Sequence, residues 1–182
     1  MPLLSEPLAT IRRDLMACSK CPALGSCVPP VGPSNPSLFI IGQAPWETEV
    51  DVGIPFCGES GKLLDELLAA ANIPRSTCFI SNAVACQLPK DRRPCEPTTI
   101  ELDNCRPFLV RQLLLLRPSA VLCLGRDAYR IFSKRVPWGD GIVIKTKTRL
   151  LLSYHPSYWL RNNNPAGFLA IAPKLKELVY GN

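Results

Sequence analysis

Four short apolar segments recur along the chain, each followed by glycine, polar or turn-forming residues. They span residues 37–41, 78–80, 120–124 and 150–153. Apolar runs of this length, without regular polar alternation, are typical of strands buried on both faces of a sheet. We therefore expect four central strands.

Helical patterns fill the intervals between these segments. Leucines recur at helical spacing over residues 62–71, where Ser60 is available as an N-cap. A longer pattern runs up to Leu116 with Pro107 as its start or a kink, and a short helix is expected over residues 127–132. Strands that alternate with helices predict an α/β fold, with three α/β/α layers and a central four-stranded parallel sheet.

The length fits a single domain over residues 1–182, since 47% apolar residues are enough for one substantial core. The longest apolar runs are interrupted by Arg117 and Pro118 and fall far short of the ~20 residues of a membrane span. The start of the chain lacks a secretory apolar core because residues 11–14 carry charges. We expect a soluble, cytoplasmic monomer, associated with the nucleoid in a bacterium and not with a membrane.

Charge and cysteine content narrow the function. The 21 basic and 15 acidic residues give a formal charge of +6, which permits binding to a polyanion without requiring it. Nine cysteines are an unusual number for a reducing compartment, and an odd count argues against a fully paired disulfide framework. Ligation of a metal or cluster is the leading explanation.

Three polar side chains follow the ends of expected strands, namely Gln43, Asn82 and His155. Sites in parallel sheets form at the carboxyl ends of strands. Residues 61–62 do not belong to a phosphate-binding P-loop, because Phe56 stands where that motif needs its first glycine. The sequence therefore predicts a site at the carboxyl ends of the strands and excludes a nucleoside triphosphatase.

Four stretches, in this order and spacing, resemble the iron–sulfur uracil-DNA glycosylases, called family 4, over most of the chain from Cys18 to Arg161. The stretches are residues 42–46 with their continuation at 53–64, residues 80–86 followed by 92–94 and Cys105, residues 122–128, and residues 154–156. The resemblance implies that fold and an enzyme that flips uracil out of single- or double-stranded DNA. It would hydrolyse the N-glycosidic bond in base excision repair.

The resemblance also implies a [4Fe–4S] cluster, with two of its four thiolate ligands in an N-terminal segment, residues 1–35. The implied ligands are Cys18, Cys21, Cys86 and Cys105. Cys27 or Cys95 could replace one of them, and zinc would accept the same spacing. The three cysteines outside these six, Cys57 among them, are interpreted as small buried apolar side chains.

For the base itself, the resemblance implies a stacking ring at Phe56, an amide at Asn82 and an imidazole at His155. An amide suits uracil because it can donate to O4 and accept from N3–H, a pattern that cytosine reverses. The imidazole would hydrogen-bond O2 as negative charge develops on the departing base.

Two positions depart from the family. Gln43 stands where the family usually has Glu, and Trp46 where it has glycine. A group must still position the attacking water or stabilise the cationic sugar, and Glu49 keeps the acidic position of the family. Glu47 and Asp51 are rivals in the same loop.

Residues 43–46 also resemble the opening of the clusterless uracil-DNA glycosylases. Those enzymes have Asp at the position of Ala44 and an aromatic ring at that of Trp46, and the ring blocks the thymine methyl group. We therefore expect Ala44 and Trp46 to border the base, with Trp46 against the C5 edge of uracil.

A segment directly after His155 is expected to contact DNA. Its candidate residues are Ser157, Tyr158, Trp159 and Arg161. Bulky side chains can wedge into the gap that a flipped base leaves. Arg161 can contact phosphates, and so can Arg92, Arg93 and Lys62. Ordinary packing at the start of a helix is an equal alternative for this segment.

Two other functions fit the same fold. One is a glycosylase for another damaged or modified base, which the departures at Gln43 and Trp46 suggest. The other is a catalytically weak module that binds DNA or associates with a polymerase. An enzyme that captures abasic sites covalently is disfavoured, because residues 90–94 contain no histidine.

Overall fold

The computed structural model describes residues 6–92, 95–133, 139–144 and 148–181. One sheet has the strand order β2-β1-β3-β5-β4. Its strands are β1 (Leu38–Gly42), β2 (Cys78–Asn82), β3 (Ala120–Leu124), β4 (Ile142–Ile144) and β5 (Arg149–Ser153). The helices are α1 (Glu6–Met16), α2 (Glu47–Val52), α3 (Glu59–Ala70), η1 (Arg75–Thr77), α4 (Thr99–Leu116), α5 (Arg126–Tyr129), α6 (Pro156–Arg161), α7 (Pro165–Leu169) and α8 (Ala172–Tyr180).

The four expected strands are confirmed as β1, β2, β3 and β5, and they run parallel. The sheet is not purely parallel, however, because β4 adds an antiparallel edge in which Ile142 pairs with Leu152. This fifth strand was missed since it has only three residues, none of them fully buried. It therefore lacks the continuous buried run that marks the other strands.

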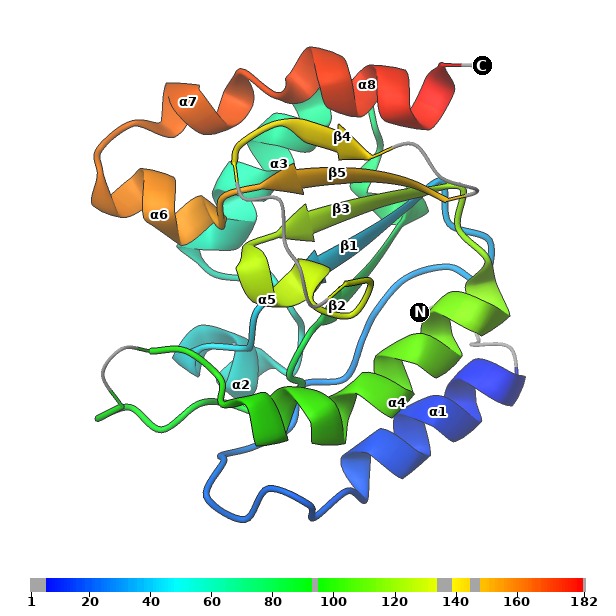
Figure 1. Cartoon of the computed structure of the whole chain (residues 1–182), viewed down its shortest axis with the longest axis vertical. Helices are drawn as coiled ribbons and strands as arrows, with labels where there is room; N and C mark the ends of the chain where they lie inside the picture. The colour runs from blue at the N-terminus through cyan, green and yellow to red at the C-terminus, as the bar shows by residue number, and fades with distance from the viewer. Residues whose placement is uncertain (1–5, 93–94, 134–138, 145–147, 182) are drawn as a thin grey trace.

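Helices cover both faces of the sheet (Figure 1). Alternate strand residues point to opposite faces. Leu38 and Ile40 belong to the core that includes residues of α3, α7 and α8, whereas Phe39 and Ile41 belong to the core formed with α1, α4 and α5. Strands β1, β2 and β3 are buried along their whole length. Burial of each large aliphatic side chain contributes about 1.5–3 kcal/mol, so this double burial explains why the strands read as continuous apolar runs.

The helix boundaries differ in detail from expectation. Helix α3 begins at Glu59 with Gly58 as its N-cap, so Ser60 lies in the first turn and is not the cap. Helix α4 begins at Thr99, and Pro107 lies inside it. Helix α5 is shorter than residues 127–132. These differences in helix boundaries leave the four expected parallel strands unchanged.

A capping box fixes the start of α4. The backbone N–H of Glu101 donates to Thr98 Oγ1 at 3.2 Å, and the backbone N–H of Thr98 donates to Glu101 Oε2 at 2.7 Å. Arg92 donates to both oxygens of the same carboxylate, at 2.7 and 2.9 Å, and this pairing lowers the pKa of Glu101 to about 2. Arg92 is thereby engaged within the protein, which does not favour the expected phosphate contact. Arg93 lies outside the described residues.

Residues 25–31 run beside β2 and the loop that follows it. Val31 forms a bridge with Ile80, and Cys27 forms one with Cys86. The backbone N–H of Val28 donates to the carbonyl of Ala85 at 2.8 Å, and further backbone bonds join residues 25–26 to residue 87. Backbone pairing therefore brings the early cysteines next to the later ones. In the part of the chain that the structure describes, no helix has the length and apolarity needed to traverse a bilayer.

Candidate active site and thiol-lined cavity

Three of the expected residues meet at the carboxyl ends of the strands. Asn82 is the last residue of β2 and pairs in register with Gly42 at the end of β1, while His155 follows β5. Phe56 enters from the loop between α2 and α3, and its ring centroid lies 5.7 Å from that of His155. A Cβ atom at Gly42 would overlap Asn82 Oδ1 and lie 2.6 Å from the Phe56 ring. Only glycine leaves the ring and the amide this close together.

The amide of Asn82 carries an unused donor. Asn82 is only 6% exposed. Its side-chain Nδ2 has no hydrogen-bond partner among the residues that the structure describes. A buried donor without a partner costs about 1–3 kcal/mol. A bound ligand, a water molecule or an ion can supply the missing acceptor.

The imidazole of His155 has one defined tautomer. Its Nδ1 lies 3.2 Å from the backbone nitrogen of Ser157 and 2.9 Å from Ser157 Oγ. Because a backbone N–H can only donate, Nδ1 is the acceptor, and the proton of the neutral ring lies on Nε2. Burial of the ring, assisted by the charge of Arg161, lowers the pKa of His155 to about 4. At neutral pH this side chain is therefore an uncharged Nε2–H donor.

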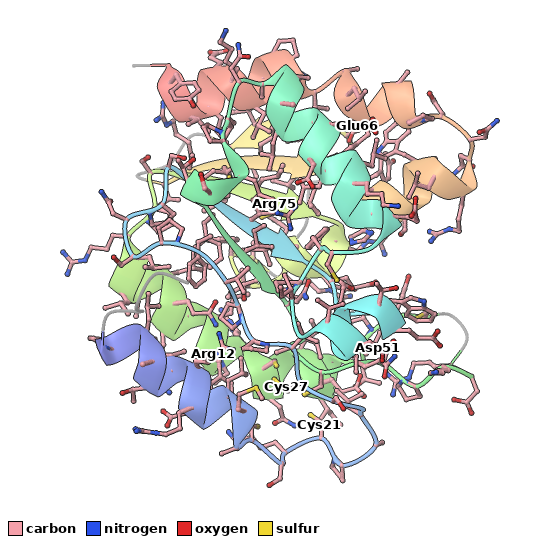
Figure 2. The ribbon with its side chains drawn as sticks, turned by 180° about the vertical axis from the view of Figure 1, so that it is seen from behind. Arg12, Cys21, Cys27, Asp51, Glu66 and Arg75 are labelled. Carbon is pink, nitrogen blue, oxygen red and sulfur yellow. The ribbon has the colours of Figure 1, made fainter. Side chains whose placement is uncertain are left out.

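The backbone of Phe56 adopts the left-handed conformation, with φ of 55°. This conformation is uncommon for a bulky residue and is strained. Its backbone N–H donates to the carboxylate of Glu49, and its carbonyl accepts from Arg75 Nη2 at 2.9 Å. Arg75 (Figure 2) is in turn held by Asp65 at 2.5 Å. Charged side chains thus hold the peptide groups on both sides of the ring.

The expected acidic residues have different surroundings. Glu49 Oε2 accepts from the backbone N–H of Trp46 at 2.7 Å, and its Oε1 accepts from Phe56. Burial raises the pKa of Glu49, and these two N–H donors offset part of the increase. Both oxygens are therefore occupied by backbone groups, which makes Glu49 a support for Phe56. Its rival Glu47 forms a salt bridge to Lys90 at 2.7 Å.

The other residues of the 43–46 segment directly follow β1. Gln43 donates from Nε2 to Asp127 Oδ2 at 2.8 Å, a partner that could not be identified from sequence. Ala44 is partly buried. Trp46 is the N-cap residue of α2 and is 46% exposed. Its ring is therefore accessible to a ligand.

The segment after His155 is divided between surface and core. Tyr158 is 39% exposed and stacks on Tyr154 with a centroid separation of 4.6 Å. Arg161 is exposed and donates to Ser157 Oγ at 3.1 Å. Trp159 instead packs inward, where a Cβ atom at Gly167 would overlap its ring. Trp159 is therefore partly buried on the core side of α6, which fits the alternative of ordinary packing at the start of a helix.

A second feature is a cavity of about 280 Å³ that contains five thiols. Its cysteines are Cys18, Cys21, Cys27, Cys86 and Cys105. The four expected ligands are all present, Cys27 joins them, and Cys95 does not line the cavity. Figure 2 shows Cys21 and Cys27 together beside α4. Cys57 differs from expectation because it is only partly buried and interacts with the Thr48 carbonyl at 3.5 Å.

Nearby N–H groups point at two of these sulfur atoms. Asn104 Nδ2 lies 3.4 Å from Cys21 Sγ, and the backbone nitrogen of Ala85 lies 3.3 Å from Cys105 Sγ. A hydrogen bond from Cys27 lowers the pKa of Cys86 to about 7, whereas burial raises that of Cys105 to about 11. Over the described ranges, no three His, Cys, Asp or Glu side chains converge closely enough to hold a single metal ion. Asn104 carries no recognisable sequence signal.

Replacement of Gly61 by alanine should destabilise the fold around Phe56. Alanine normally gains about 1 kcal/mol over glycine inside a helix, but a Cβ here would overlap the Phe56 carbonyl. We expect a net loss of about 1–3 kcal/mol in unfolding free energy, measured by urea denaturation. Gly58→Ala is the control, since its Cβ would lie 3.7 Å from Thr48. Equal stability of the two variants would contradict this close approach.

The single histidine should titrate far below its usual range. NMR of the imidazole is expected to give a midpoint near pH 4, against about 6.5 in urea-unfolded protein. The unfolded chain then binds the proton more tightly, so unfolding free energy should fall as pH drops from about 6.5 to about 4. A folded-state midpoint near 6.5, or a proton on Nδ1 at neutral pH, would refute the assigned state.

Comparison with known proteins places this site within a family. The family model of the uracil DNA glycosylase superfamily matches residues 29–176. A type-4 uracil-DNA glycosylase of Archaeoglobus fulgidus is 39% identical over 126 residues, which cover 68% of this chain and 62% of that protein. The chain therefore spans less than two thirds of that relative.

Other relatives are covered more fully. A type-4 uracil-DNA glycosylase of Thermotoga maritima is 32% identical over 168 residues, covering 87% of this chain and 86% of that protein. One from Sulfurisphaera tokodaii is 31% identical over 175 residues, covering 87% and 78%. The chain belongs to the uracil DNA glycosylase superfamily.

Proposed function

We propose that this protein is a monofunctional uracil-DNA glycosylase, a hydrolase that removes uracil from DNA in base excision repair. The observation that carries the proposal is the unpartnered Nδ2 of buried Asn82, within a site shared with Phe56 and His155. The relatives named type-4 uracil-DNA glycosylases support the same assignment. The substrate would be DNA in which the uracil nucleotide has been turned out of the base stack.

Base recognition follows from the chemistry of Asn82. Its Nδ2 would donate to uracil O4, and its Oδ1 would accept from N3–H. Cytosine carries a donating amino group in place of O4 and an accepting N3 in place of N3–H. Both Nδ2 and Oδ1 of Asn82 would then face a group of the same kind and stay unpaired. Phe56 would stack on the base, and Ala44 and Trp46 would border it. We assign to Trp46, whose ring is accessible, the C5 edge where thymine carries a methyl group.

Bond cleavage would rely on His155. As the glycosidic bond breaks, its electron pair moves onto uracil and negative charge develops at O2. The neutral Nε2–H of His155 would donate a hydrogen bond to that oxygen, because Ser157 already occupies Nδ1. A fixed donor of this kind contributes about 10²–10³-fold to the rate. Gln43 would act on the attacking water, and Glu49 would hold Phe56 in place.

DNA would approach over the exposed side of α6. Tyr158 and Arg161 are accessible there, whereas Ser157 and Trp159 would support them from behind. Arg161 would contact a phosphate, so affinity should weaken with salt. Lys62, which is exposed on α3 and paired with Glu59, is a secondary candidate.

We also propose that a [4Fe–4S] cluster is the resident cofactor. Its ligands would be Cys18, Cys21, Cys86 and Cys105, which line one cavity. The N–H donors at two of the sulfurs fit thiolate ligands, since such donors stabilise sulfur-bound negative charge. When bound, the cluster supplies iron–thiolate bonds that join residues 1–35 to the loop after β2 and to α4. Its contribution would therefore be structural.

Excision of uracil tests the function directly. A duplex with one uracil should acquire an alkali-labile site when incubated with the iron-loaded protein. His155→Ala and Asn82→Ala should each be slower by about 10²-fold or more, whereas Glu177→Gln on α8 should match the wild type. Cleavage of hypoxanthine or xanthine substrates without cleavage of uracil would favour a different base. Failure to cleave any of them would favour a binding module.

Iron analysis tests the cofactor and its ligands. The wild type should contain about four iron atoms per chain and absorb visible light. Cys105→Ser should lose both properties because its thiol lies in the cavity. Cys95→Ser should retain them, and so should Cys27→Ser, since four ligands remain. Zinc in place of iron, or loss of iron in Cys95→Ser, would contradict the assignment.

A further inference from the structure

Asp127 is a buried carboxylate with no part in the proposed mechanism so far. It lies in the first turn of α5, just past the end of β3, and is 7% exposed. Its Oδ2 accepts from Gln43 Nε2 at 2.8 Å, and its Oδ1 accepts from Arg130 Nη1 at 3.1 Å. Arg130 therefore supplies the compensating positive charge within the same helix region.

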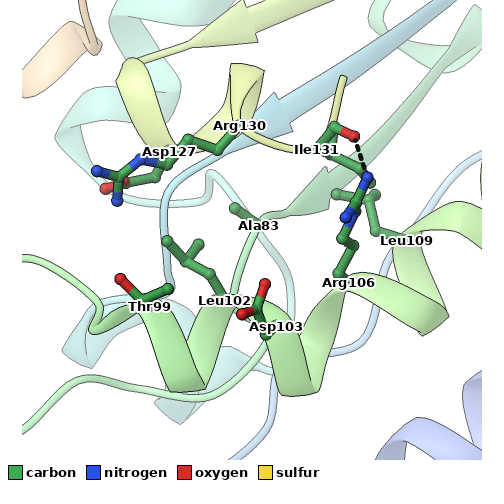
Figure 3. A pocket seen from close by; sticks show the side chains of 9 residues that line it. All are labelled: Ala83, Thr99, Leu102, Asp103, Arg106, Leu109, Asp127, Arg130 and Ile131. Carbon is green, nitrogen blue, oxygen red and sulfur yellow. Dashed lines mark hydrogen bonds and ion pairs between the residues drawn. The ribbon is translucent and has the colours of Figure 1, made fainter. Parts of the chain in front are cut away.

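The surroundings of this pair are well defined. Asp127 and Arg130 lie together at one rim of a cavity of about 240 Å³ between α4 and α5 (Figure 3). The other charged groups lining that cavity, Asp103 and Arg106, come from α4. Arg106 donates to the carbonyl of Ile131 at 3.1 Å. Arg130 is thus the cation paired with Asp127.

The chemistry of the carboxylate fixes the direction of the Gln43 amide. An ionised carboxylate only accepts hydrogen bonds, whereas an amide has one donating and one accepting end. Nε2 must therefore face Asp127, and Oε1 is the opposite end. Among the described residues, no hydrogen bond is made to Gln43 Oε1. Oε1 is therefore the free acceptor of Gln43, and Gln43 directly follows Gly42, which lies against Asn82 and Phe56.

We propose that Asp127 is a positioning residue that orients Gln43 so that its carbonyl oxygen holds the attacking water. This inference rests on the proposed function. In the reaction, the water oxygen bonds to sugar C1′ while the bond to uracil N1 breaks and its electron pair leaves with the base. The surplus water proton passes to solvent. An acceptor at Oε1 aligns the water and leaves its oxygen lone pair free, whereas a donor would occupy that pair.

Asp127→Asn tests the orientation. Arg130 should still donate to the side-chain oxygen of the new asparagine, so the asparagine NH2 group would face Gln43. The Gln43 amide would then rotate so that Oε1 accepts from that NH2 group and Nε2 takes the place of the free acceptor. We expect kcat for uracil excision to fall by about tenfold or more with KM unchanged. Asp103→Asn, on the α4 side of the cavity, should retain wild-type kcat. A wild-type kcat in Asp127→Asn would overturn the proposal.

Gln43→Glu provides a readout that needs no activity. It would place two carboxylates where a donor and an acceptor now lie 2.8 Å apart, so one would bind a proton more tightly in the folded state. Melting temperature should then fall relative to wild type as pH rises from about 5 to 8. Adding Asp127→Asn should remove that fall, because the new amide can donate to Glu. Matching pH dependence of Gln43→Glu and wild type would overturn the proposed contact.

The two readouts separate this proposal from the proposed function. Suppose that the wild type excises no uracil but that the melting temperature of Gln43→Glu still falls with rising pH. This result would refute the glycosylase assignment and hence the role of Asp127 in positioning the water. The contact between Gln43 and Asp127 would still stand. The double variant Gln43→Glu, Asp127→Asn provides one more comparison. A kcat above that of either single variant would support the proposal that Asp127 acts through residue 43.

Discussion

The conformation of Phe56 is the constraint on which the site depends. A positive φ is unfavourable for a residue with a large side chain, so the surrounding structure must compensate for its cost. Glu49 and Arg75 supply that compensation through the two peptide groups that flank the ring. Gly61 allows α3 to approach the same carbonyl. The ring is therefore fixed before any ligand arrives, which limits the entropy lost on binding.

Parallel strands bring the remaining groups to the same place. The ends of β1, β2 and β5 deliver Gly42, Asn82 and His155 from positions far apart in sequence. The two faces of this sheet are packed with apolar residues, so the strand ends are rigid. A rigid frame suits a site in which one amide and one imidazole must each present a defined donor. The hydrogen bond from Ser157 leaves His155 with a donor at Nε2, and the hydrogen bond to Asp127 leaves Gln43 with an acceptor at Oε1; in each case the other end of the side chain is occupied.

Much of this arrangement could be predicted from sequence. Continuous apolar runs located the four central strands, and strand-end polar residues located Asn82 and His155. Strand β4 was missed because a short, partly exposed edge strand leaves no such run. The two alternatives for Trp159 could not be separated from sequence, because aromatic bulk alone does not reveal which side of a helix faces the core. Asp127 and Asn104 were missed because their partners lie far away in sequence.

The thiol-lined cavity shows the same limit of sequence reasoning. The resemblance implied four ligands and left Cys27 and Cys95 open, and only tertiary structure separates these two. Pairing of the N-terminal segment with the loop after β2 carries Cys27 to the cavity. Cys95 lies elsewhere, although it is close to Cys86 and Cys105 in sequence.

We propose that the unused donor of Asn82 and the Nε2–H of His155 both form hydrogen bonds to uracil. Side-chain amide and imidazole N–H resonances, followed by NMR during titration with free uracil, test this most directly. We expect uracil to shift both resonances and an equal concentration of cytosine to leave them in place. Unmoved resonances with saturating uracil, or equal shifts with cytosine, would contradict it.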